Sequence, residues 1–501
     1  TSPLGQTLTL AAYYAVLAML AVYGAHRGVM VHLYYRHRRD TPRPAGRLPA
    51  LPRVTVQLPI YNEVYVVERL VEAVAAMDYP RALLQIQILD DSDDETREAA
   101  RAMTARLSAR GFQIAHCART HREGFKAGAL QAGLAAATGD YLLILDADFV
   151  PGPEMLRACL PFFADPDVGM VQARWGHLNR DFSLLTRIQA MLLDGHFVIE
   201  HTARHRSGRF FNFNGTAGIW RRTCVEASGG WQADTLTEDL DLSYRAQLLG
   251  WKFVYLKDCV APAELPVDMN GVKSQQHRWT KGSIQTGRKL LPTIWKSRLP
   301  WKIKSEAFFH LTSNLSYVLV VLLALLMVPA ILIRDRIGWQ KLAIVDFPLF
   351  FGATFSFLAF YVSSQREIGR GWKPTLRCLP FLLALGIGIS INNAGAVLEG
   401  LFRRPTGFTR TPKYRIEGPQ GEWRSKKYRA SGSGSFGGEL LLALYFLAVL
   451  VFAVRFRYWA AVPFLLVFFQ GFASTAALSA TSWWAGRRRP LLLPASIPPP
   501  G

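Results

Sequence analysis

Two acidic motifs near the middle of the chain carry residue types that could act on a phosphorylated substrate. The first, Asp146-Ala147-Asp148, follows an apolar run of strand length at 141–145. A buried strand that ends in Asp-x-Asp directs two carboxylates into the cleft beyond its carboxyl end. Paired carboxylate oxygens suit Mg²⁺ or Mn²⁺ carrying a diphosphate. The second motif, Thr237-Glu238-Asp239, supplies a candidate general base.

A third motif follows along the chain and adds groups that bind phosphate and sugar. Gln275-Gln276-His277-Arg278-Trp279 places an arginine, which suits phosphate, beside a tryptophan that can stack on an apolar ring face. Alone, each motif is weak, because Asp-x-Asp usually lies in a solvated turn and a lone acidic pair is usually surface charge. Their order, between apolar segments of membrane length, makes the combination informative.

The composition indicates a water-soluble domain joined to membrane-spanning segments. The 501 residues are too many for one ordinary domain, and half are hydrophobic although 19% are charged. The net charge of +21 fits nucleic acid or an anionic membrane surface. Basic residues cluster beside apolar segments, so we expect membrane lipids and no nucleic acid. The five cysteines lack CxxC spacing, which disfavours a zinc site or a disulfide framework and fits a reducing cytosol.

Five apolar segments are long enough to be considered as membrane crossings. The first, Leu4–Ala25, is followed by a run of arginines, which places that flank in the cytosol. A further run, Leu379–Leu398, is interrupted by Asn392-Asn393 and is predicted to be interfacial or re-entrant; it would be a sixth crossing if it spans. The other four predicted crossings are Leu315–Ile333, Leu342–Val362, Leu440–Val454 and Tyr458–Ala480.

Between the first crossing and the others, the pattern from Val54 to about Leu265 alternates short apolar runs with amphipathic ones. The order strand, helix, strand, helix, strand predicts a mostly parallel sheet with ligands at the carboxyl ends of its strands. No GxGxxG or P-loop is present, which removes the main support for a dinucleotide-binding or ATP-hydrolysing protein. Strands are predicted at 54–59, 84–89, 113–117 and 141–145, and helices at 68–77, 96–110 and 126–137. Val272–Lys304 is basic and amphipathic and is predicted to lie on the membrane surface.

The motifs and their order resemble those of membrane-integrated family 2 glycosyltransferases, which include cellulose, hyaluronan and chitin synthases and the plant cellulose-synthase-like mannan and glucan synthases. Val171–Trp175 and the run that follows it to Trp231 look most like the plant mannan and glucan branch. The matching segments are Leu58–Glu63, Asp90–Ser92, Gly124–Leu130, Asp146–Asp148, Phe213–Thr216, Thr237–Asp239 and Gln275–Trp279.

The resemblance implies an α/β GT-A-like glycosyltransferase domain with a mostly parallel sheet, inserted between transmembrane α-helices. The expected divisions are a transmembrane helix with its basic flank (1–40), a linker (41–53), the cytosolic catalytic domain (54–271), interfacial amphipathic helices (272–310), transmembrane helices with an interfacial segment (311–400), a cytosolic gating-type loop (401–436) and a final transmembrane hairpin with its tail (437–501).

The same resemblance implies a role for each motif residue. Asp239, with Glu238, is expected to be catalytic, and Asp146 and Asp148 to bind Mg²⁺ or Mn²⁺. Three histidines, His196, His201 and His205, are spaced irregularly for a metal site and are predicted to be structural. The expected donor-binding residues are Tyr61, Glu63, Asp90, Asp91, Lys126, Asp146, Gln275 and Arg278, and the acceptor-binding residues are Trp279, Asn214, Gly215 and Thr216.

A loop beyond the catalytic domain resembles the gating loop of cellulose synthases. Phe408, Thr411 and Lys413 match its Phe-x-Val-Thr-x-Lys pattern and are expected to close over the bound donor. Arg410 stands where the family has valine. An ordinary basic loop next to the membrane is the alternative.

The expected activity is processive, inverting synthesis of a β-linked polysaccharide that passes across the membrane. UDP-glucose is the favoured donor and GDP-mannose the next, with accessory export subunits as candidate partners. The expected location is the bacterial inner membrane or an equivalent membrane, with several crossings and a cytosolic catalytic domain. Two alternatives remain: a non-processive transferase acting on a lipid acceptor, and an inactive glycan-export channel.

Overall fold

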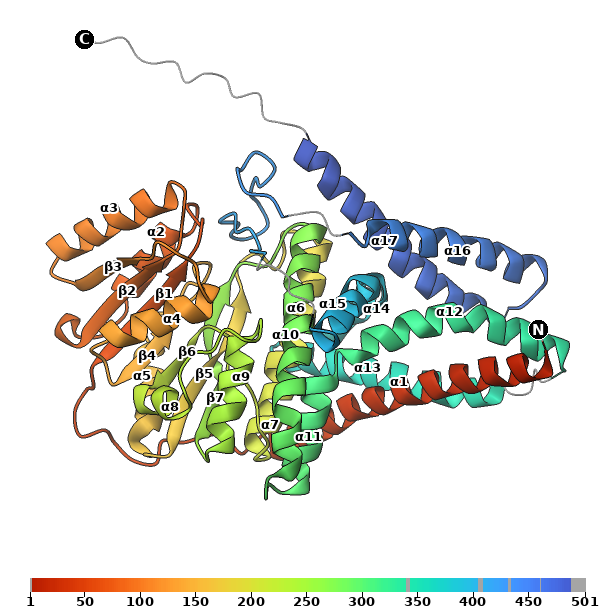
Figure 1. The fold of residues 1–501 in the computed structure, drawn as a ribbon, viewed down its shortest axis with the longest axis horizontal. Coiled ribbons are helices and arrows are strands. Elements are labelled where there is room, and N and C mark those ends of the chain that lie inside the picture. Colours follow the sequence, from red (N-terminus) through yellow and green to blue (C-terminus); the bar gives the residue numbers. More distant parts are fainter. Residues whose placement is uncertain (1, 339–342, 404–408, 431–433, 460, 488–501) are drawn as a thin grey trace, which may run out of the picture.

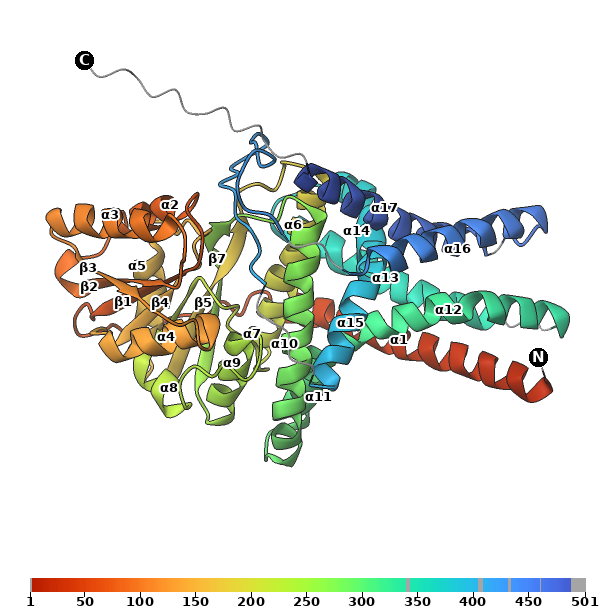
Figure 2. The ribbon, with the colours of Figure 1, turned by 45° about the horizontal axis from the view of Figure 1, so that its top comes forward.

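A layered α/β domain occupies one side of the molecule, and a bundle of long helices extends from it to the other (Figure 1). This computed structural model describes residues 2–338, 343–403, 409–430, 434–459 and 461–487. Helices α10 and α11 lie between the two parts and cross the direction of the bundle helices in both views (Figure 2). The two parts correspond to the predicted catalytic and membrane regions.

The α/β domain is built on a seven-stranded sheet in the order β3-β2-β1-β4-β6-β5-β7. Neighbouring strands are parallel, except that β6 is antiparallel to both β4 and β5. The predicted mostly parallel sheet is therefore confirmed, and the four predicted strands are observed with ends within one residue of the prediction. The strands are β1 (Val54–Ile60), β2 (Leu84–Asp90), β3 (Gln113–Ala118), β4 (Tyr141–Ile144), β5 (Val168–His177), β6 (Gly218–Arg221) and β7 (Lys252–Ala263).

Helices cover both faces of this sheet, so the central strands are buried on both sides. Residues of β1 and β4 such as Val56, Leu58, Leu142 and Leu143 are fully buried, which explains their unbroken apolar runs. Helices α2 (Val67–Ala75), α3 (Thr96–Ala109) and α5 (Met155–Cys159) pack on one face, and α4 (Phe125–Ala136), α8 (Arg222–Ala227) and α9 (Glu238–Leu248) pack on the other (Figure 2).

The strand directions bring the sequence motifs to one edge of the sheet. The carboxyl ends of β1, β2 and β4 lie at the same edge, since Ile60 pairs with Asp90 and Gln57 with Ile144. Because β6 is antiparallel, its first residue, Gly218, pairs with Ile144 at that edge. The segment before β6 is therefore placed beside the Asp-x-Asp motif that follows β4.

Four of the predicted crossings are confirmed as helices long and apolar enough to span a membrane. They are α1 (Pro3–His37), α12 (Leu315–Arg336), α16 (Phe436–Arg455) and the 462–482 part of α17 (Val462–Arg487). The fifth prediction falls on α13 (Ala343–Glu367), and its first residue, Leu342, lies outside the described residues.

The run predicted to be interfacial or re-entrant forms two helices that meet at a bend. Helices α14 (Trp372–Gly388) and α15 (Ser390–Leu401) are inclined by 43° and together are apolar enough for one broken span or a re-entrant segment. The break comes at Ile389, just before the Asn392-Asn393 pair that interrupts the apolar pattern. Helix α15 packs along α10, and α14 packs along α17.

The basic segment Val272–Lys304, predicted to lie on the membrane surface within the interfacial helices of 272–310, has two features that the sequence did not specify. The segment forms two helices, α10 (Met269–Lys296) and α11 (Trp301–Thr312), because the chain turns at Ser297–Pro300. Part of the basic face is also buried: Lys273 and Lys281 are at most 1% exposed. Both lysines form ion pairs with acidic residues of the membrane part, so their charge faces protein instead of lipid headgroups.

The pair formed by Lys273 and Glu439 joins α10 to the membrane bundle. The Nζ of Lys273 lies 2.6 Å from a carboxylate oxygen of Glu439, and both side chains are fully buried. Ser435 donates a further hydrogen bond to Glu439, and Asn392 donates one to the backbone carbonyl of Lys273. Helices α10, α15 and α16 thus meet at one buried charge pair.

Glu439→Ala is expected to lower the free energy of unfolding by about 3–5 kcal/mol, because it leaves the Lys273 ammonium buried without its counterion. The double variant Lys273→Met with Glu439→Leu should stay close to the parent, since both charges are removed together. The exposed pair of Arg222 and Glu226 provides a control, for which Glu226→Ala should cost about 1 kcal/mol or less. The measurement is thermal unfolding in detergent, and equal midpoints for Glu439→Ala and Glu226→Ala would contradict this account.

Candidate active site

A single pocket at the carboxyl edge of the sheet gathers most of the predicted site residues. Its walls come from the loops after β1, β2 and β4, from the amino-terminal ends of α4 and α9, from α10, and from the segment at 410–413. The predicted residues that line it are Tyr61, Glu63, Asp91, Lys126, Asp146, Asp148, Asn214, Gly215, Glu238, Asp239, Gln275, Arg278, Trp279, Thr411 and Lys413.

The two carboxylates of the Asp-x-Asp motif each contact a lysine from a different part of the chain. The Nζ of Lys126, at the start of α4, lies 2.5 Å from Oδ1 of Asp146 and also donates to the carbonyl of Gly215. The Nζ of Lys413 lies 2.5 Å from Oδ2 of Asp148. These ion pairs offset the cost of gathering carboxylates in a largely buried pocket.

The donor set of the Asp-x-Asp motif fits a divalent cation that shares its coordination with a substrate. Among the described residues, no group of three or more His, Cys, Asp or Glu side chains is arranged to hold a metal by itself. Mg²⁺ bound with nucleotides commonly takes only one or two protein carboxylates, with phosphate and water oxygens completing its shell. Asp146 and Asp148 line the same pocket and are paired with lysines on flexible stems, so they meet this requirement.

Two adjacent carboxylates at the start of α9, Glu238 and Asp239, are half-buried, and the charge of Glu238 acts on Asp239. Burial, followed by the negative charge of Glu238, raises the pKa of Asp239 to about 7. Burial likewise raises the pKa of Glu238, although the charge of Lys126 opposes the shift. A carboxylate that ionises near neutral pH is suited to accept a proton during catalysis.

A glycine opposite the candidate base leaves space that a larger residue would fill. Gly215 has a φ of +78°, and a Cβ atom at this position would lie 3.1 Å from Oδ2 of Asp239. Only glycine adopts this conformation readily and keeps the carboxylate accessible. The peptide carbonyl of Gly215 accepts a hydrogen bond of 2.9 Å from Lys126, which connects this loop to the Asp-x-Asp motif.

Helix α10 supplies the guanidinium of Arg278 and the indole of Trp279 to a further wall of the pocket. Nη2 of Arg278 donates a hydrogen bond of 2.9 Å to the hydroxyl of Thr411, so this arginine also contacts the loop that resembles a gating loop. Trp279 lies 6.4 Å from the ring of Trp175 at the end of β5. The two indoles form an aromatic corner of the pocket, which is suited to the apolar face of a sugar ring.

Asp90, one of the predicted donor-binding residues, does not line the pocket. Its side chain is fully buried and lies 2.7 Å from Nε2 of His116. Burial alone would raise the pKa of Asp90, but hydrogen bonds from His116 and Ser92 hold it below its usual value. Asp90 therefore holds the end of β2 in place, and its contact with the donor stays a prediction. Its neighbour Asp91 does line the pocket but is held by Arg119 through two hydrogen bonds.

Thr216, predicted to contact the acceptor, is not among the residues that line the pocket. Thr216 is fully buried, and its hydroxyl accepts a hydrogen bond of 2.8 Å from the backbone N–H of Asp146. It therefore orients the Asp-x-Asp loop from behind and does not line the pocket, where it was expected to contact the acceptor. The prediction for Phe408 lies outside the described residues.

The loop that resembles a gating loop is docked over the pocket by several specific contacts. The backbone N–H groups of Tyr414 and Arg415 both donate to the carboxylate of Glu264, at 2.8 Å each. Further along the chain, the hydroxyl of Tyr428 donates to Asp94 at 2.6 Å. We refer to residues 409–430 as the strap, because they connect the Asp-x-Asp side of the pocket to the start of α3.

Three charged residues of the pocket were missed as site residues in the sequence. The guanidinium of Arg122 lies 3.3 Å from the centre of the Tyr61 ring, and Nη1 of Arg410 donates to the Tyr61 carbonyl at 2.7 Å. Glu264 is the third. Its position directly after β7 was a usable signal, since other pocket acids also follow parallel strands. In the sequence, Arg410 was marked only as a departure from the gating-loop pattern, and no signal marked Arg122.

The chain is similar to plant enzymes over most of its length. Residues 52–282 match the family model described as "Glycosyltransferase like family 2". Glucomannan 4-beta-mannosyltransferase 1 of Oryza sativa subsp. japonica is 37% identical over 308 residues, which cover 60% of this chain and 59% of the relative. Probable glucomannan 4-beta-mannosyltransferase 9 of the same plant is 36% identical over 368 residues, with 68% and 70% covered. Glucomannan 4-beta-mannosyltransferase 2 of Arabidopsis thaliana is 41% identical over 252 residues, with 49% and 47% covered. The chain thus spans between 47% and 70% of the length of these relatives.

A solved structure shares the fold. The mannosyltransferase PcManGT from Pyrobaculum calidifontis, in complex with GDP-Man and Mn²⁺, superposes with a TM-score of 0.52 over 79% of this chain and all of that one. The two sequences are 21% identical, so the likeness concerns the arrangement of helices and strands.

Proposed function

The chain belongs to the family 2 glycosyltransferases, and we propose that it transfers mannosyl units from GDP-mannose to the end of a growing β-linked polysaccharide. The observation that carries this proposal is the meeting, in one pocket, of a candidate base, a cationic wall and an aromatic corner. The plant relatives are named as mannosyltransferases, which supports mannose. UDP-glucose, favoured from the sequence alone, finds no support among these relatives.

Asp239 is the residue that receives the proton in this mechanism. Its carboxylate takes the proton of the acceptor hydroxyl while the hydroxyl oxygen forms a bond to the anomeric carbon of the donor. The bond from that carbon to the diphosphate oxygen breaks on the opposite face, so the configuration inverts. Arg278 and Lys126 line the wall where the leaving diphosphate gathers charge, and Trp279 supports the acceptor ring.

Asp146 and Asp148 would hold Mg²⁺ or Mn²⁺ together with the diphosphate of the donor. When bound, such a cation supplies positive charge to the departing phosphate oxygens. The lysines paired with these aspartates would then be free to turn toward phosphate oxygens, which are equally good partners for an ammonium group.

We expect the purified protein to make a ladder of oligosaccharides from radiolabelled GDP-mannose, in an assay that compares GDP-mannose with UDP-glucose and other nucleotide sugars. Asp239→Asn should lower the transfer rate by about 10²–10⁴ while donor binding is retained, since the carboxylate acts on the acceptor. The sizes of the labelled products and equilibrium binding of the donor are the two measurements.

The same assay separates the alternatives and includes the metal. Activity should disappear after chelation with EDTA and return with Mg²⁺ or Mn²⁺. A single lipid-linked sugar would contradict polymer synthesis, whereas a ladder from UDP-glucose alone would contradict the choice of mannose. Full activity after exhaustive chelation would remove the metal from the mechanism.

The raised pKa of Asp239 predicts a pH dependence of the reaction. The base must be ionised, so kcat/KM should fall as the pH drops below about 7 and level off above it. Glu238→Gln removes the neighbouring negative charge, lowers the pKa of Asp239 and should move this fall to lower pH. Glu238→Asp keeps the charge and serves as the matched control. Coinciding pH profiles for Glu238→Gln and the parent would show that the two carboxylates are not coupled.

Transport of the product across the membrane is a further part of the proposal. Trp279 belongs to α10, and His277 and Lys281 on the same helix contact Glu399 of α15 at 3.1 Å each. A sugar held at Trp279 therefore lies close to the helices of the membrane part, which gives an elongating chain a short route into them.

We expect product to accumulate inside sealed vesicles that carry the enzyme with its donor-binding side outward. A glycan-degrading enzyme added outside should leave this product intact until detergent opens the vesicles, and the product length should then fall. Immediate digestion without detergent would contradict transport. Vesicles containing Asp239→Asn control for label that binds without being polymerised.

A further inference from the structure

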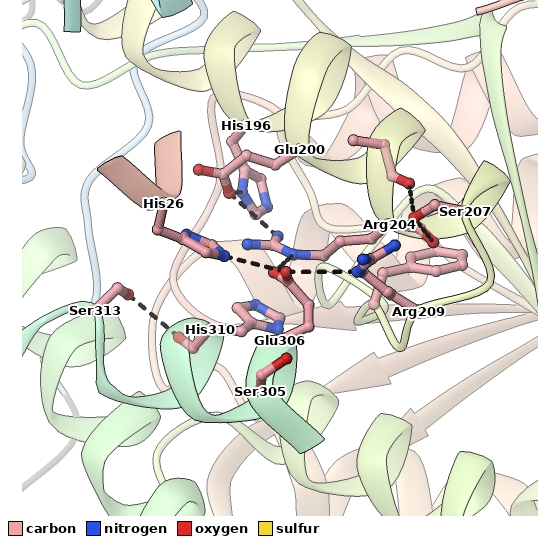
Figure 3. A network of polar contacts seen from close by, with 12 residues as sticks. His26, His196, Glu200, Arg204, Ser207, Arg209, Ser305, Glu306, His310 and Ser313 are labelled. Carbon is pink, nitrogen blue, oxygen red and sulfur yellow. Dashed lines mark hydrogen bonds and ion pairs between the residues drawn. The ribbon is translucent and has the colours of Figure 1, made fainter. Parts of the chain in front are cut away.

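A continuous series of polar contacts runs from the membrane helix α1 to the wall of the pocket. Most of the side chains involved converge between α1, α11 and the segment 195–206 (Figure 3). The contacts are His26 to Glu306 at 3.0 Å, Glu306 to Arg204 at 2.9 Å, Arg204 to Glu200 at 3.1 Å, Glu200 to His196 at 3.0 Å and His196 to Asn214 at 3.1 Å.

The central part of this series lies on an unusual helical element. Residues Gly195–His201 form the π-helix η3, between α6 (Leu184–Asp194) and α7 (Thr202–Arg206). Such elements are rare and are frequently found at functional sites. A Cβ atom on Gly195 would lie 2.5 Å from the ring of Phe360, so η3 is pressed closely against α13. His196 and Glu200 both belong to η3, so close packing on α13 restricts the backbone that carries them.

The charges within the series are well balanced, which favours one fixed arrangement. Burial would raise the pKa of Glu200, but Arg204 and His196 hold it well below its usual value. Glu306 is buried too, and His26 and Arg204 lower its pKa to about 2. Both carboxylates are therefore ionised at neutral pH and act as hydrogen-bond acceptors for His196, Arg204 and His26.

The hydrogen-bond directions fix the amide of Asn214. Nε2 of His201 faces two oxygens, the carbonyl of Asn212 at 3.1 Å and Oδ1 of Asn214 at 2.5 Å, so it must carry a hydrogen. Oδ1 of Asn214 is thus an acceptor, and Nδ2 of Asn214 donates to Nε2 of His196. Nδ1 of His196 then carries the hydrogen that is donated to Glu200.

This arrangement leaves Asn214 with one amide hydrogen that neither histidine uses. Asn214 lines the pocket, and it precedes Gly215, whose Cβ position lies 3.1 Å from Oδ2 of Asp239. The amide is therefore adjacent to the region where the acceptor hydroxyl must approach the base. An N–H donor at this place can hold a hydroxyl oxygen of the acceptor sugar.

We propose that His196 is a positioning residue that orients the Asn214 amide toward the acceptor sugar, and that Glu200, Arg204, Glu306 and His26 hold this orientation from the membrane helix α1. The inference rests on the proposed glycosyl transfer and adds a residue that was predicted to be only structural. It also gives α1 a part in binding the acceptor. Within the series, α1 acts through one contact, the pair of His26 with Glu306 of α11.

The test compares two reactions of the same enzyme: transfer of the sugar to an oligosaccharide acceptor, and the slow hydrolysis of GDP-mannose by water. His196→Phe keeps an aromatic ring of similar size but removes both hydrogen bonds. We expect the rate of transfer to fall about tenfold and the acceptor KM to rise. A tenfold loss is near the upper end for one hydrogen bond, here the bond from the Asn214 amide to the acceptor sugar. Donor KM and donor hydrolysis should change less than twofold, so the ratio of hydrolysis to transfer rises.

Two further variants separate positioning from folding. His205→Phe is the matched control, because His205 is a half-buried histidine on the neighbouring helix α7 that contacts Phe211 and takes no part in the series. It should leave the ratio unchanged. His26→Phe keeps the stacking on Phe309 at 4.4 Å but removes the contact with Glu306, and should raise the ratio by a smaller factor.

The outcomes are distinguishable from one another. An unchanged ratio in His196→Phe, or an equal loss of transfer and hydrolysis, would overturn the inference and leave His196 with a structural role. If His196→Phe does not fold, an unchanged ratio in His26→Phe overturns the inference and a raised one supports it. If the unaltered protein transfers no sugar from any donor, the proposed function fails instead, before a variant is compared.

Discussion

The buried pocket gathers several carboxylates, and the rest of the structure must neutralise them. Glu63, Asp146, Asp148, Glu238 and Asp239 face the same space. Burial there raises the pKa of Glu63, Glu238 and Asp239 and so disfavours their charged forms. The cations that compensate them are Lys126, Arg278, Arg410 and Lys413. They come from α4, from α10 and from the strap, and the last two segments adjoin the membrane helices. The charge balance of the pocket therefore depends on the membrane part as well as on the sheet.

The cations of the pocket do not fully offset the effect of burial on its carboxylates, and this changes how those carboxylates ionise. Burial raises the pKa of Glu63 to about 7, against the opposing charge of Arg410, and Asp239 has a similar value. A pocket with carboxylates that ionise near neutral pH and with lysines on flexible stems can exchange partners when a diphosphate enters. The same lysines that balance the aspartates are good ligands for phosphate, so binding of the donor and charge balance are linked.

Helix α10 is the element through which the soluble and membrane parts are joined. It carries the arginine and tryptophan of the pocket on one face, and buried lysines that pair with Glu439 and Glu399 on another. Below it, α11 contacts α1 and α7 through Glu306 (Figure 3). A movement of the bundle would therefore reach both the diphosphate wall and the acceptor wall of the pocket.

The order of apolar and amphipathic runs was enough to predict the first strands and four membrane helices, and parallel strands place whatever follows them at one edge. The roles of individual pocket residues came from the resemblance of their motifs to family 2 glycosyltransferases. Other features depended on tertiary contacts. Asp90 and Asp91 are adjacent in sequence, but the position of His116 on β3 takes Asp90 out of the pocket. Lys273 and Lys281 belong to a basic pattern that predicts surface charges, but α15 and α16 cover them in the folded protein.

No sequence signal marked His196 as a positioning residue. Its role follows from two partners, Asn214 and Glu200, which the π-helical turn brings within reach. Local pattern determines which residues follow a strand, whereas the partner of a buried charge is decided by which distant element packs against it.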